Sequence, residues 1–81
     1  MTPRDIVCLR KRLGFNQPRL ARFIEINQVT ICRWETGHSK PAGLSLVVLR
    51  ALHEAVSTDA GLRRILKFRD LAELIEAAGL L

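Results

Sequence analysis

The most regular pattern of apolar and polar positions lies in the second quarter of the chain. The spacings from Leu20 to Ile24 and from Ile31 to Trp34 bring apolar side chains onto one face of each of two short helices. Asn27 is a good N-cap and restarts a helix soon after the first apolar pair. The pattern therefore predicts three consecutive elements, namely a helix, a turn and a second helix: 17–24, 25–27 and 28–36.

A further helix is predicted ahead of this pair. Thr2 and Pro3 make a typical helix start, because threonine is a good N-cap and proline is tolerated in the first turn. Gly14 is a typical stop, since glycine readily takes the left-handed conformation that ends many helices. Apolar side chains recur between these signals at helical spacing: Ile6, Leu9 and Leu13. We expect a helix over 3–13, and Gly37 is expected to end the later helix in the same way.

A longer helix is predicted after the loop that ends at Pro41, from residue 42 or 43 to Val56. Apolar side chains share one face of this helix: Leu44, Val47, Val48, Ala51, Leu52 and Ala55. Leu46 and Leu49 lie partly off that face, which indicates burial on more than one side.

The C-terminal part of the chain holds two shorter apolar patterns. Ser57, Thr58 and Asp59 offer a new N-cap, and the apolar phase slips around residues 68–70. This slip predicts a break between two short helices, the second of which is closed by Gly79.

The predicted fold is all-α, with five to six short helices in a single domain. Eighty-one residues support one small core and no second independent unit. We place the core of the domain in residues 1–56 and a helical extension in residues 57–81.

The charge is divided unevenly between these parts. Residues 1–50 carry nine Lys or Arg against three acidic residues, a net charge of +6. Residues 51–81 carry four basic against five acidic residues, a net charge of −1. A polyanion is a natural partner for the first part, and a partner of another kind for the second. The alternative is that the basic surface only keeps the chain in solution.

Other classes of function find no support in the residues. Cys8 and Cys32 have no metal-ligand spacing to His38 or His53, and no glycine-rich phosphate loop is present. The N-terminus lacks a signal-peptide pattern, and no apolar run approaches membrane-spanning length. We therefore expect a cytoplasmic protein that is not an enzyme and that uses no cofactor, metal or small-molecule substrate.

Two short helices that meet across a tight turn in a basic segment are typical of a helix-turn-helix, whose second helix lies in the DNA major groove. Residues near the start of that helix and one turn later would face the base edges. Gln28 suits adenine, Arg33 suits guanine and Val29 suits a thymine methyl group, while Thr30 suits a base or a phosphate. Ordinary solvent exposure is the alternative for these four residues.

Two other residues of this helix have competing interpretations. Trp34 could stack on bases, but its phase with Ile31 places it in the core. Cys32 lies off the core face, where it could act as a redox-sensing thiol or, as a small residue, allow close approach to DNA. His53 is expected on the surface of the long helix.

Four groups of residues resemble the Cro/C1-type (XRE-like) helix-turn-helix domain of lambdoid phage repressors and many bacterial antitoxins. They are residues 13–17 (Leu-Gly-Phe-Asn-Gln), Leu20-Ala21, residues 31–37 (Ile-Cys-Arg-Trp-Glu-Thr-Gly) and Pro41. The resemblance covers about residues 1–55 and implies a lambda-repressor-like fold. The stretch that leads from Trp34 into the leucine-rich helix looks closest to HigA- and MqsA-type antitoxin regulators.

The resemblance implies roles for three further residues and exposes one departure. It implies that Gln17 binds a phosphate at a helix N-terminus and that Arg10 and Glu35 form a structural ion pair. The family usually has glycine in the turn, where this chain has Glu25. Additional phosphate contacts are expected from polar and basic residues near the motif: Asn27, Arg19, Arg22, Ser39, Lys40 and His38.

The C-terminal extension carries more apolar side chains than the first three helices need to cover. We favour a homodimer built on Leu71, Leu74, Ile75, Leu80 and Leu81, and the alternative is that these residues complete the core of the monomer. A two-fold dimer would read a palindromic operator.

The function expected from these residues is that of a homodimeric transcriptional repressor of its own operon, bacterial or phage-encoded and associated with the nucleoid. The alternative is an antitoxin whose main partner is a toxin protein. A phage repressor of the Cro type is equally compatible with the sequence.

Overall fold

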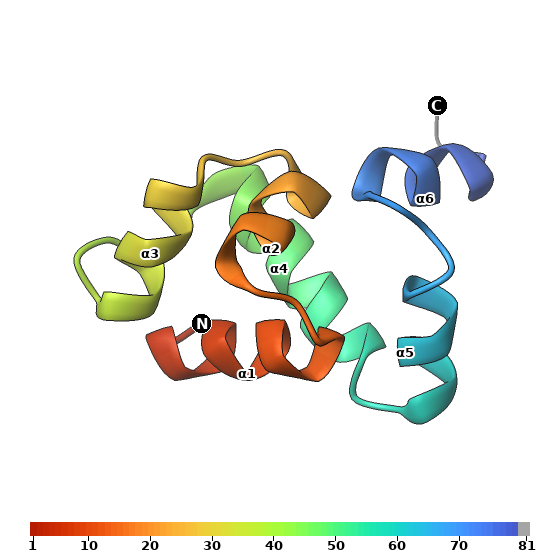
Figure 1. Ribbon diagram of the computed structural model, residues 1–81, viewed down its shortest axis with the longest axis horizontal. Coiled ribbons are helices and arrows are strands. Elements are labelled where there is room, and N and C mark those ends of the chain that lie inside the picture. The colour runs from red at the N-terminus through yellow and green to blue at the C-terminus, as the bar shows by residue number, and fades with distance from the viewer. Residues whose placement is uncertain (80–81) are drawn as a thin grey trace.

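Side chains that cap the backbone set the start of almost every helix. In the computed structural model, which describes residues 1–79, six helices follow one another along the chain and no strand is present (Figure 1): α1 (Pro3–Leu13), α2 (Gln17–Ile24), α3 (Gln28–Thr36), α4 (Gly43–Ala55), α5 (Asp59–Ile65) and α6 (Leu71–Ala77). The capping side chains belong to Thr2, Asn16, Asn27, Thr58 and Asp70. Helix α4 is the exception, because Ala42 precedes it and makes no side-chain cap.

The cap of α1 is reciprocal. The Thr2 amide donates to Asp5 Oδ2 at 2.8 Å, and the Asp5 amide donates to Thr2 Oγ1 at 3.2 Å. Hydrogen bonds from the backbone and side chain of Thr2 lower the pKa of Asp5 below its ordinary value of 3.8, because they stabilise the carboxylate. A capping box of this kind orients the start of the helix.

The bounds predicted for the first three helices match the structure. Helix α4 begins at Gly43, and Val56, predicted as its last residue, is its C-cap. The predicted break near residues 68–70 is also present, because α5 ends at Ile65 and Asp70 caps α6.

A single core lies between α1, α2, α3 and α4. In Figure 1, α3 lies at one end of the molecule, α5 and α6 lie at the other, and α4 crosses behind α2. Fully buried side chains come from all four of these helices: Ile6, Leu9, Leu20, Phe23, Ile31 and Leu49. Trp34 is 4% exposed and belongs to this core, as its phase predicted.

Helix α4 departs from the prediction. Leu44 and Val47 were expected on its core face but are 78% and 63% exposed, whereas Leu49, placed partly off that face, is fully buried. The helix is apolar on more than one side, and Leu49 and Leu52 are the side chains that the neighbouring helices cover. Periodicity alone does not distinguish two apolar stripes on one helix, because the choice depends on the packing partner.

The C-terminal helices close over the end of this core. Leu71 and Leu74 of α6 are half-buried and pack against the core, so the monomer itself covers part of these two side chains. Ile75 is also half-buried, while Leu80 and Leu81 lie outside the described residues. Among residues 1–79, no helix is both long enough and apolar enough to span a bilayer.

Helix α5 lies very close to the end of α4. A Cβ atom added to Gly61 would lie 1.8 Å from the Ala55 carbonyl oxygen. From α1, the Arg12 Nε donates to the Val56 carbonyl oxygen at 2.9 Å, and its Nη2 lies 3.1 Å from Asp59 Oδ1. These contacts hold the α4–α5 turn against α1.

Candidate nucleic-acid interface

One side of α3 is exposed along its full length. Ile31 and Trp34 anchor the opposite side in the core, with 0% and 4% exposure. The exposed residues recur three to four positions apart, as helical geometry requires of a single face: Gln28, Val29, Cys32, Arg33 and Thr36. The helix therefore presents a continuous row of side chains while its own position is determined by buried contacts.

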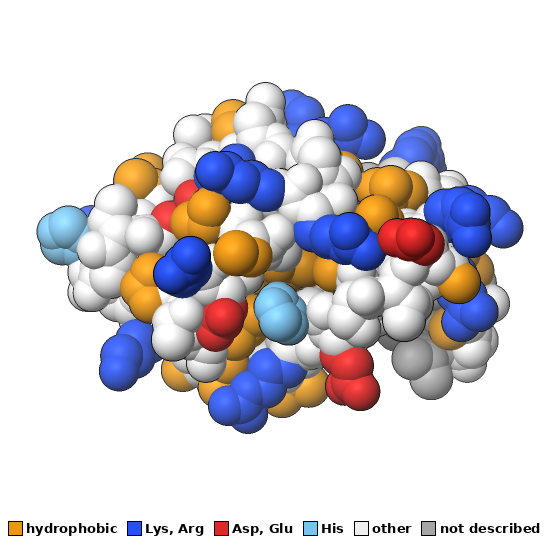
Figure 2. Space-filling view, turned by 90° about the horizontal axis from the view of Figure 1, so that it is seen from below, with side chains coloured by type: hydrophobic (Ala, Val, Ile, Leu, Met, Phe, Trp, Pro, Cys, Tyr) orange, Lys and Arg blue, Asp and Glu red, His pale blue; other side chains and the backbone are white. Residues whose placement is uncertain are grey.

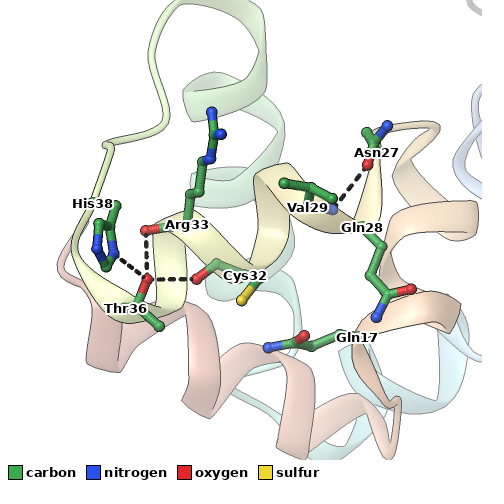
Figure 3. A pocket seen from close by; sticks show the side chains of 8 residues that line it. All are labelled: Gln17, Asn27, Gln28, Val29, Cys32, Arg33, Thr36 and His38. Carbon is green, nitrogen blue, oxygen red and sulfur yellow. Dashed lines mark hydrogen bonds between the residues drawn. The ribbon is translucent and has the colours of Figure 1, made fainter.

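A concave surface of about 710 Å³ lies against this row (Figure 3). Gln17 and Asn27 from the starts of α2 and α3, and His38 from the loop after α3, complete its lining. In Figure 3 the side chains of Gln17 and Gln28 lie on one side of α3, and Arg33 extends from the other side. The lining offers amide and guanidinium groups beside one apolar side chain, which suits binding to base edges and phosphates.

The predicted base-contacting residues occupy different positions in this arrangement. Gln28, Val29 and Arg33 are exposed and line the concave surface, with Val29 58% exposed. Thr30 is half-buried and does not line it.

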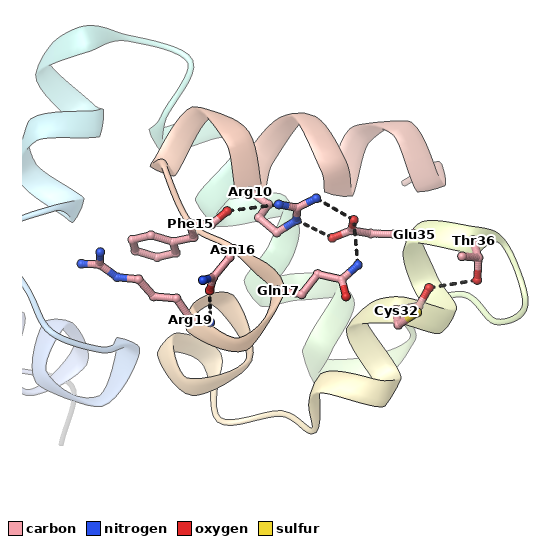
Figure 4. Close-up of polar contacts among 8 residues, drawn as sticks. All are labelled: Arg10, Phe15, Asn16, Gln17, Arg19, Cys32, Glu35 and Thr36. Carbon is pink, nitrogen blue, oxygen red and sulfur yellow. Dashed lines mark hydrogen bonds and ion pairs between the residues drawn. The ribbon is translucent and has the colours of Figure 1, made fainter.

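The predicted phosphate-contacting residues are more dispersed. Arg22 lines an adjoining hollow of about 530 Å³ together with Asn27 and Gln28. Ser39 and Lys40 are exposed in the loop after α3 but line neither hollow. The Arg19 guanidinium lies 4.5 Å from the centre of the Phe15 ring, and in Figure 4 its side chain points away from α3.

A polar network joins α1, α2 and α3 beneath this surface (Figure 4). The Arg10 Nε and Nη2 donate to the two carboxylate oxygens of Glu35 at 2.7 and 2.9 Å, and Arg10 Nη1 donates to the Phe15 carbonyl oxygen at 3.1 Å. The two charged side chains are only 17% and 6% exposed. Hydrogen bonds to Glu35 raise the pKa of Arg10, so its guanidinium stays charged.

Gln17 is bound into the same network. Its Nε2 donates to Glu35 Oε1 at 3.2 Å, which places the amide of α2 beside α3. One amide hydrogen of Gln17 is thus occupied by the protein, and the other is available to a phosphate oxygen. The hydrogen bond to Glu35 therefore fixes the position of the Gln17 side chain relative to the exposed row of α3.

Two of the lining side chains are oriented by local hydrogen bonds. Asn27 Oδ1 accepts from the Val29 amide at 2.8 Å, which leaves the amide NH₂ of Asn27 free to donate elsewhere. The Thr36 hydroxyl lies 2.9 Å from the Cys32 carbonyl oxygen and 2.8 Å from His38 Nδ1. These bonds tie the His38 loop to the end of α3.

The turn between α2 and α3 contains a non-glycine residue with positive φ. Glu25 has φ 57° and ψ 48° and ends α2 in the left-handed conformation. The Ile26 amide donates to the Ala21 carbonyl oxygen at 2.9 Å, which closes the helix end. A side chain in this conformation costs about 1 kcal/mol or more relative to glycine. The turn thus keeps its left-handed conformation without the expected glycine.

Cys32 and Thr36 were not among the residues expected to contact bases or phosphates, although close approach of DNA to Cys32 was one interpretation of that residue. The structure places both in the concave surface. Their positions, four and eight residues after Gln28, repeat the helical spacing of the exposed row. This spacing is the signal in the sequence that could have identified them.

Positive charge is not confined to this end of the molecule. Figure 2 shows the face that lies lowest in Figure 1, with Lys and Arg side chains spread along its length and few acidic side chains among them. The candidate interface is therefore distinguished by its shape and by its amide groups more than by local charge.

In comparisons with known proteins, no family model, no curated protein sequence and no solved structure matches this chain.

Proposed function

We propose that this chain is a sequence-specific DNA-binding regulator in which α2, the turn and α3 form a helix-turn-helix of the Cro/C1 type. The observation that carries the proposal is the exposed row of α3, held by the buried contacts of Ile31 and Trp34 on the opposite side. A helix supported in this way can enter the major groove of DNA without moving relative to the rest of the domain.

Sequence preference would come from three side chains of the row. Gln28 can form paired hydrogen bonds with adenine, Arg33 can do the same with guanine, and Val29 can contact a thymine methyl group. Each paired contact discriminates against a wrong base by about 1–3 kcal/mol.

Affinity would come mainly from phosphate contacts around the row. Gln17 is supported in this role by its place as the first residue of α2, where its own backbone amide has no partner within the helix and one hydrogen of its side-chain amide is not used by Glu35. Asn27 lines the concave surface, Arg22 lines the adjoining hollow, and Lys40 is exposed in the loop after α3. Such contacts release counterions, so the affinity would fall steeply with salt concentration.

Regulation would follow from occupancy. Two copies related by a two-fold axis would place their α3 helices roughly 34–36 Å apart on one face of the duplex. The binding site would then be palindromic, and a dimer bound across a promoter would exclude polymerase. The simplest circuit is repression of the chain's own operon.

The test begins with selection of preferred duplexes from a random pool, followed by fluorescence anisotropy at several salt concentrations. The wild-type protein is expected to bind the selected duplex far more tightly than a random one. Arg33→Ala is expected to weaken binding to the selected site by about 1–3 kcal/mol and to relax its base preference.

The matched control is Arg63→Ala, which removes the same charge from the exposed surface of α5. It is expected to leave the base preference unchanged. Equal, salt-sensitive binding of the wild-type protein to every duplex would contradict the proposal. So would an Arg33→Ala protein with the wild-type preference, because α3 would then not read the bases.

A further inference from the structure

Helix α4 carries an apolar ridge that no part of the described chain covers. Leu44 and Val47 are 78% and 63% exposed, and Ala51 is also exposed on the next turn. Their spacing of three and four residues puts them on one face of the helix. Large exposed apolar patches on small soluble domains usually mark an interaction surface.

An apolar groove runs directly beside this ridge. It has a volume of about 310 Å³ and lies between α4 and the C-terminal helices, with Val48 and Ala55 on one wall and Leu71 and Ile75 on the other. Every residue that lines it has an apolar side chain, in contrast to the polar lining of the concave surface at α3. Val47 belongs both to the ridge and to the edge of the groove.

We propose that a second copy of this chain docks on the α4 face, with the Leu44–Val47 ridge of each copy seated in the α4–α6 groove of the other. A two-fold interface uses the same patch on both subunits, so it requires a patch that is complementary to itself. A projection and a hollow side by side on one face meet this requirement, because the two-fold rotation places each projection over the partner's hollow.

The charges around the face favour a copy of the chain over nucleic acid. The whole chain carries +5, so two copies repel each other unless the apposed surfaces are apolar or balanced in charge. Helices α4 and α6 together contain one arginine, Arg50, and three acidic residues, Glu54, Glu73 and Glu76. With a net charge of −2 on these two helices, the face is unattractive to a phosphate backbone, and the ridge and the groove bring apolar side chains against apolar side chains when two copies meet.

The inference rests on the proposed function for its two-fold symmetry, and it changes the residues assigned to the dimer. Leu71 and Leu74 are already partly covered within the monomer, so they would form the wall of the groove and not the centre of the contact. The exposed side chains at the centre would be Leu44 and Val47.

The test compares two valines of similar exposure in sedimentation equilibrium. Val47→Asp places a charge in the centre of the proposed contact, and Val29→Asp places the same charge on α3. The wild-type chain and Val29→Asp are expected to dimerise alike. Val47→Asp is expected to raise the dimer dissociation constant by roughly a hundredfold or more, because each dimer would lose two buried valine side chains.

Folding and DNA binding separate the possible failures. Far-ultraviolet circular dichroism checks that both variants keep their helices. Val47→Asp is expected to retain salt-sensitive binding to short duplexes, whereas Val29→Asp is expected to lose preference for the selected site. If neither Val29→Asp nor Val47→Asp changes DNA binding, but Val47→Asp still prevents dimerisation, the proposed function is wrong and the α4 interface is supported.

A measurement on the wild-type chain covers the case in which Val47→Asp does not fold. On dilution, amide chemical shifts are expected to change along α4 and α6 and to stay constant along α3. A wild-type chain that stays monomeric up to millimolar concentration would overturn the inference. Dilution shifts confined to other helices, or a folded Val47→Asp that dimerises like the wild type, would also overturn it.

Discussion

Helices α1–α3 and helices α4–α6 are held in place by different kinds of contact. In the first group, the ion pair of Arg10 with Glu35 joins residues 25 positions apart in the sequence, and the two side chains are 17% and 6% exposed. In the second group, the ion pair of Arg69 with Glu73 lies within four residues, and the arginine is 87% exposed. Helices α4 to α6 pack on one another through apolar contacts and close backbone approach, and Arg12 of α1 adds polar contacts with Val56 and Asp59 at the α4–α5 turn.

This difference bears on what each region can do. The buried network of α1–α3 gives the exposed row of α3 a definite orientation, which recognition of a rigid partner requires. The second region leaves Leu44 and Val47 uncovered and has a groove beside them, which suits association through apolar surface. A largely buried polar network thus positions the exposed row of α3, while uncovered apolar side chains mark the surface of α4.

The largest effect is expected from breaking the buried pair. Arg10→Ala leaves the Glu35 carboxylate buried with only Gln17 beside it, which should lower the free energy of unfolding by about 3 kcal/mol. The exposed counterpart, Arg69→Ala, should leave the stability close to that of the wild type, because exposed pairs contribute little. Urea titrations of both variants measure the contrast.

A double variant sharpens this result. Arg10→Ala combined with Glu35→Ala should cost less than the two single variants added together, because no uncompensated charge then stays buried. If Arg10→Ala and Arg69→Ala lowered the free energy of unfolding equally, the ion pair of α1–α3 would contribute no more to stability than the exposed pair of α4–α6.

The close contact of α5 with α4 gives the next largest effect. Alanine in place of glycine within a helix normally stabilises it by about 1 kcal/mol. Gly61→Ala should instead destabilise the domain by about 2 kcal/mol, because the added carbon would displace the Ala55 carbonyl. Ala60→Ser, at the exposed neighbouring position, is the control and should change the stability little. A thermal melt in which Gly61→Ala gains stability would contradict the observed helix separation.

The smallest effect concerns the turn between α2 and α3. Glu25→Gly should stabilise the domain by about 0.5–1 kcal/mol, because glycine adopts the left-handed conformation without a steric penalty. Glu25→Ala keeps the β-carbon, which causes the steric penalty, and removes the rest of the side chain with its charge, so its stability should stay near that of the wild type. If both variants gained equally in urea titrations, loss of the side chain beyond the β-carbon, and not backbone conformation, would be the cause.

Much of the candidate site could be expected from the sequence. The positions of Gln28 and Arg33 on the outer side of α3 follow from the helical phase of Ile31 and Trp34. The contact of Gln17 with Glu35 does not follow from any local pattern, because it depends on how α2 crosses α3. The packing of the Arg19 guanidinium on the Phe15 ring also does not follow from a local pattern. The sequence led us to expect a phosphate contact for this residue.

The sequence by itself determined where five of the six helices in residues 1–79 begin and where α1 and α3 end. Thr2, Asn16 and Asn27 act on amides two or three residues away, and Gly14 and Gly37 permit the left-handed conformation at their own positions. Signals of this range can be read from the chain because no distant residue takes part in them.

Only the tertiary structure decided which apolar surface is buried and which is left exposed. Leu44 and Leu49 lie on the same apolar helix, yet one is 78% exposed and the other is fully buried. Burial of an apolar side chain is favourable against any apolar neighbour, so hydrophobicity sets no preference between the two stripes of α4. The choice follows from how α1 and α5 pack against α4, and it leaves the Leu44–Val47 ridge on the surface.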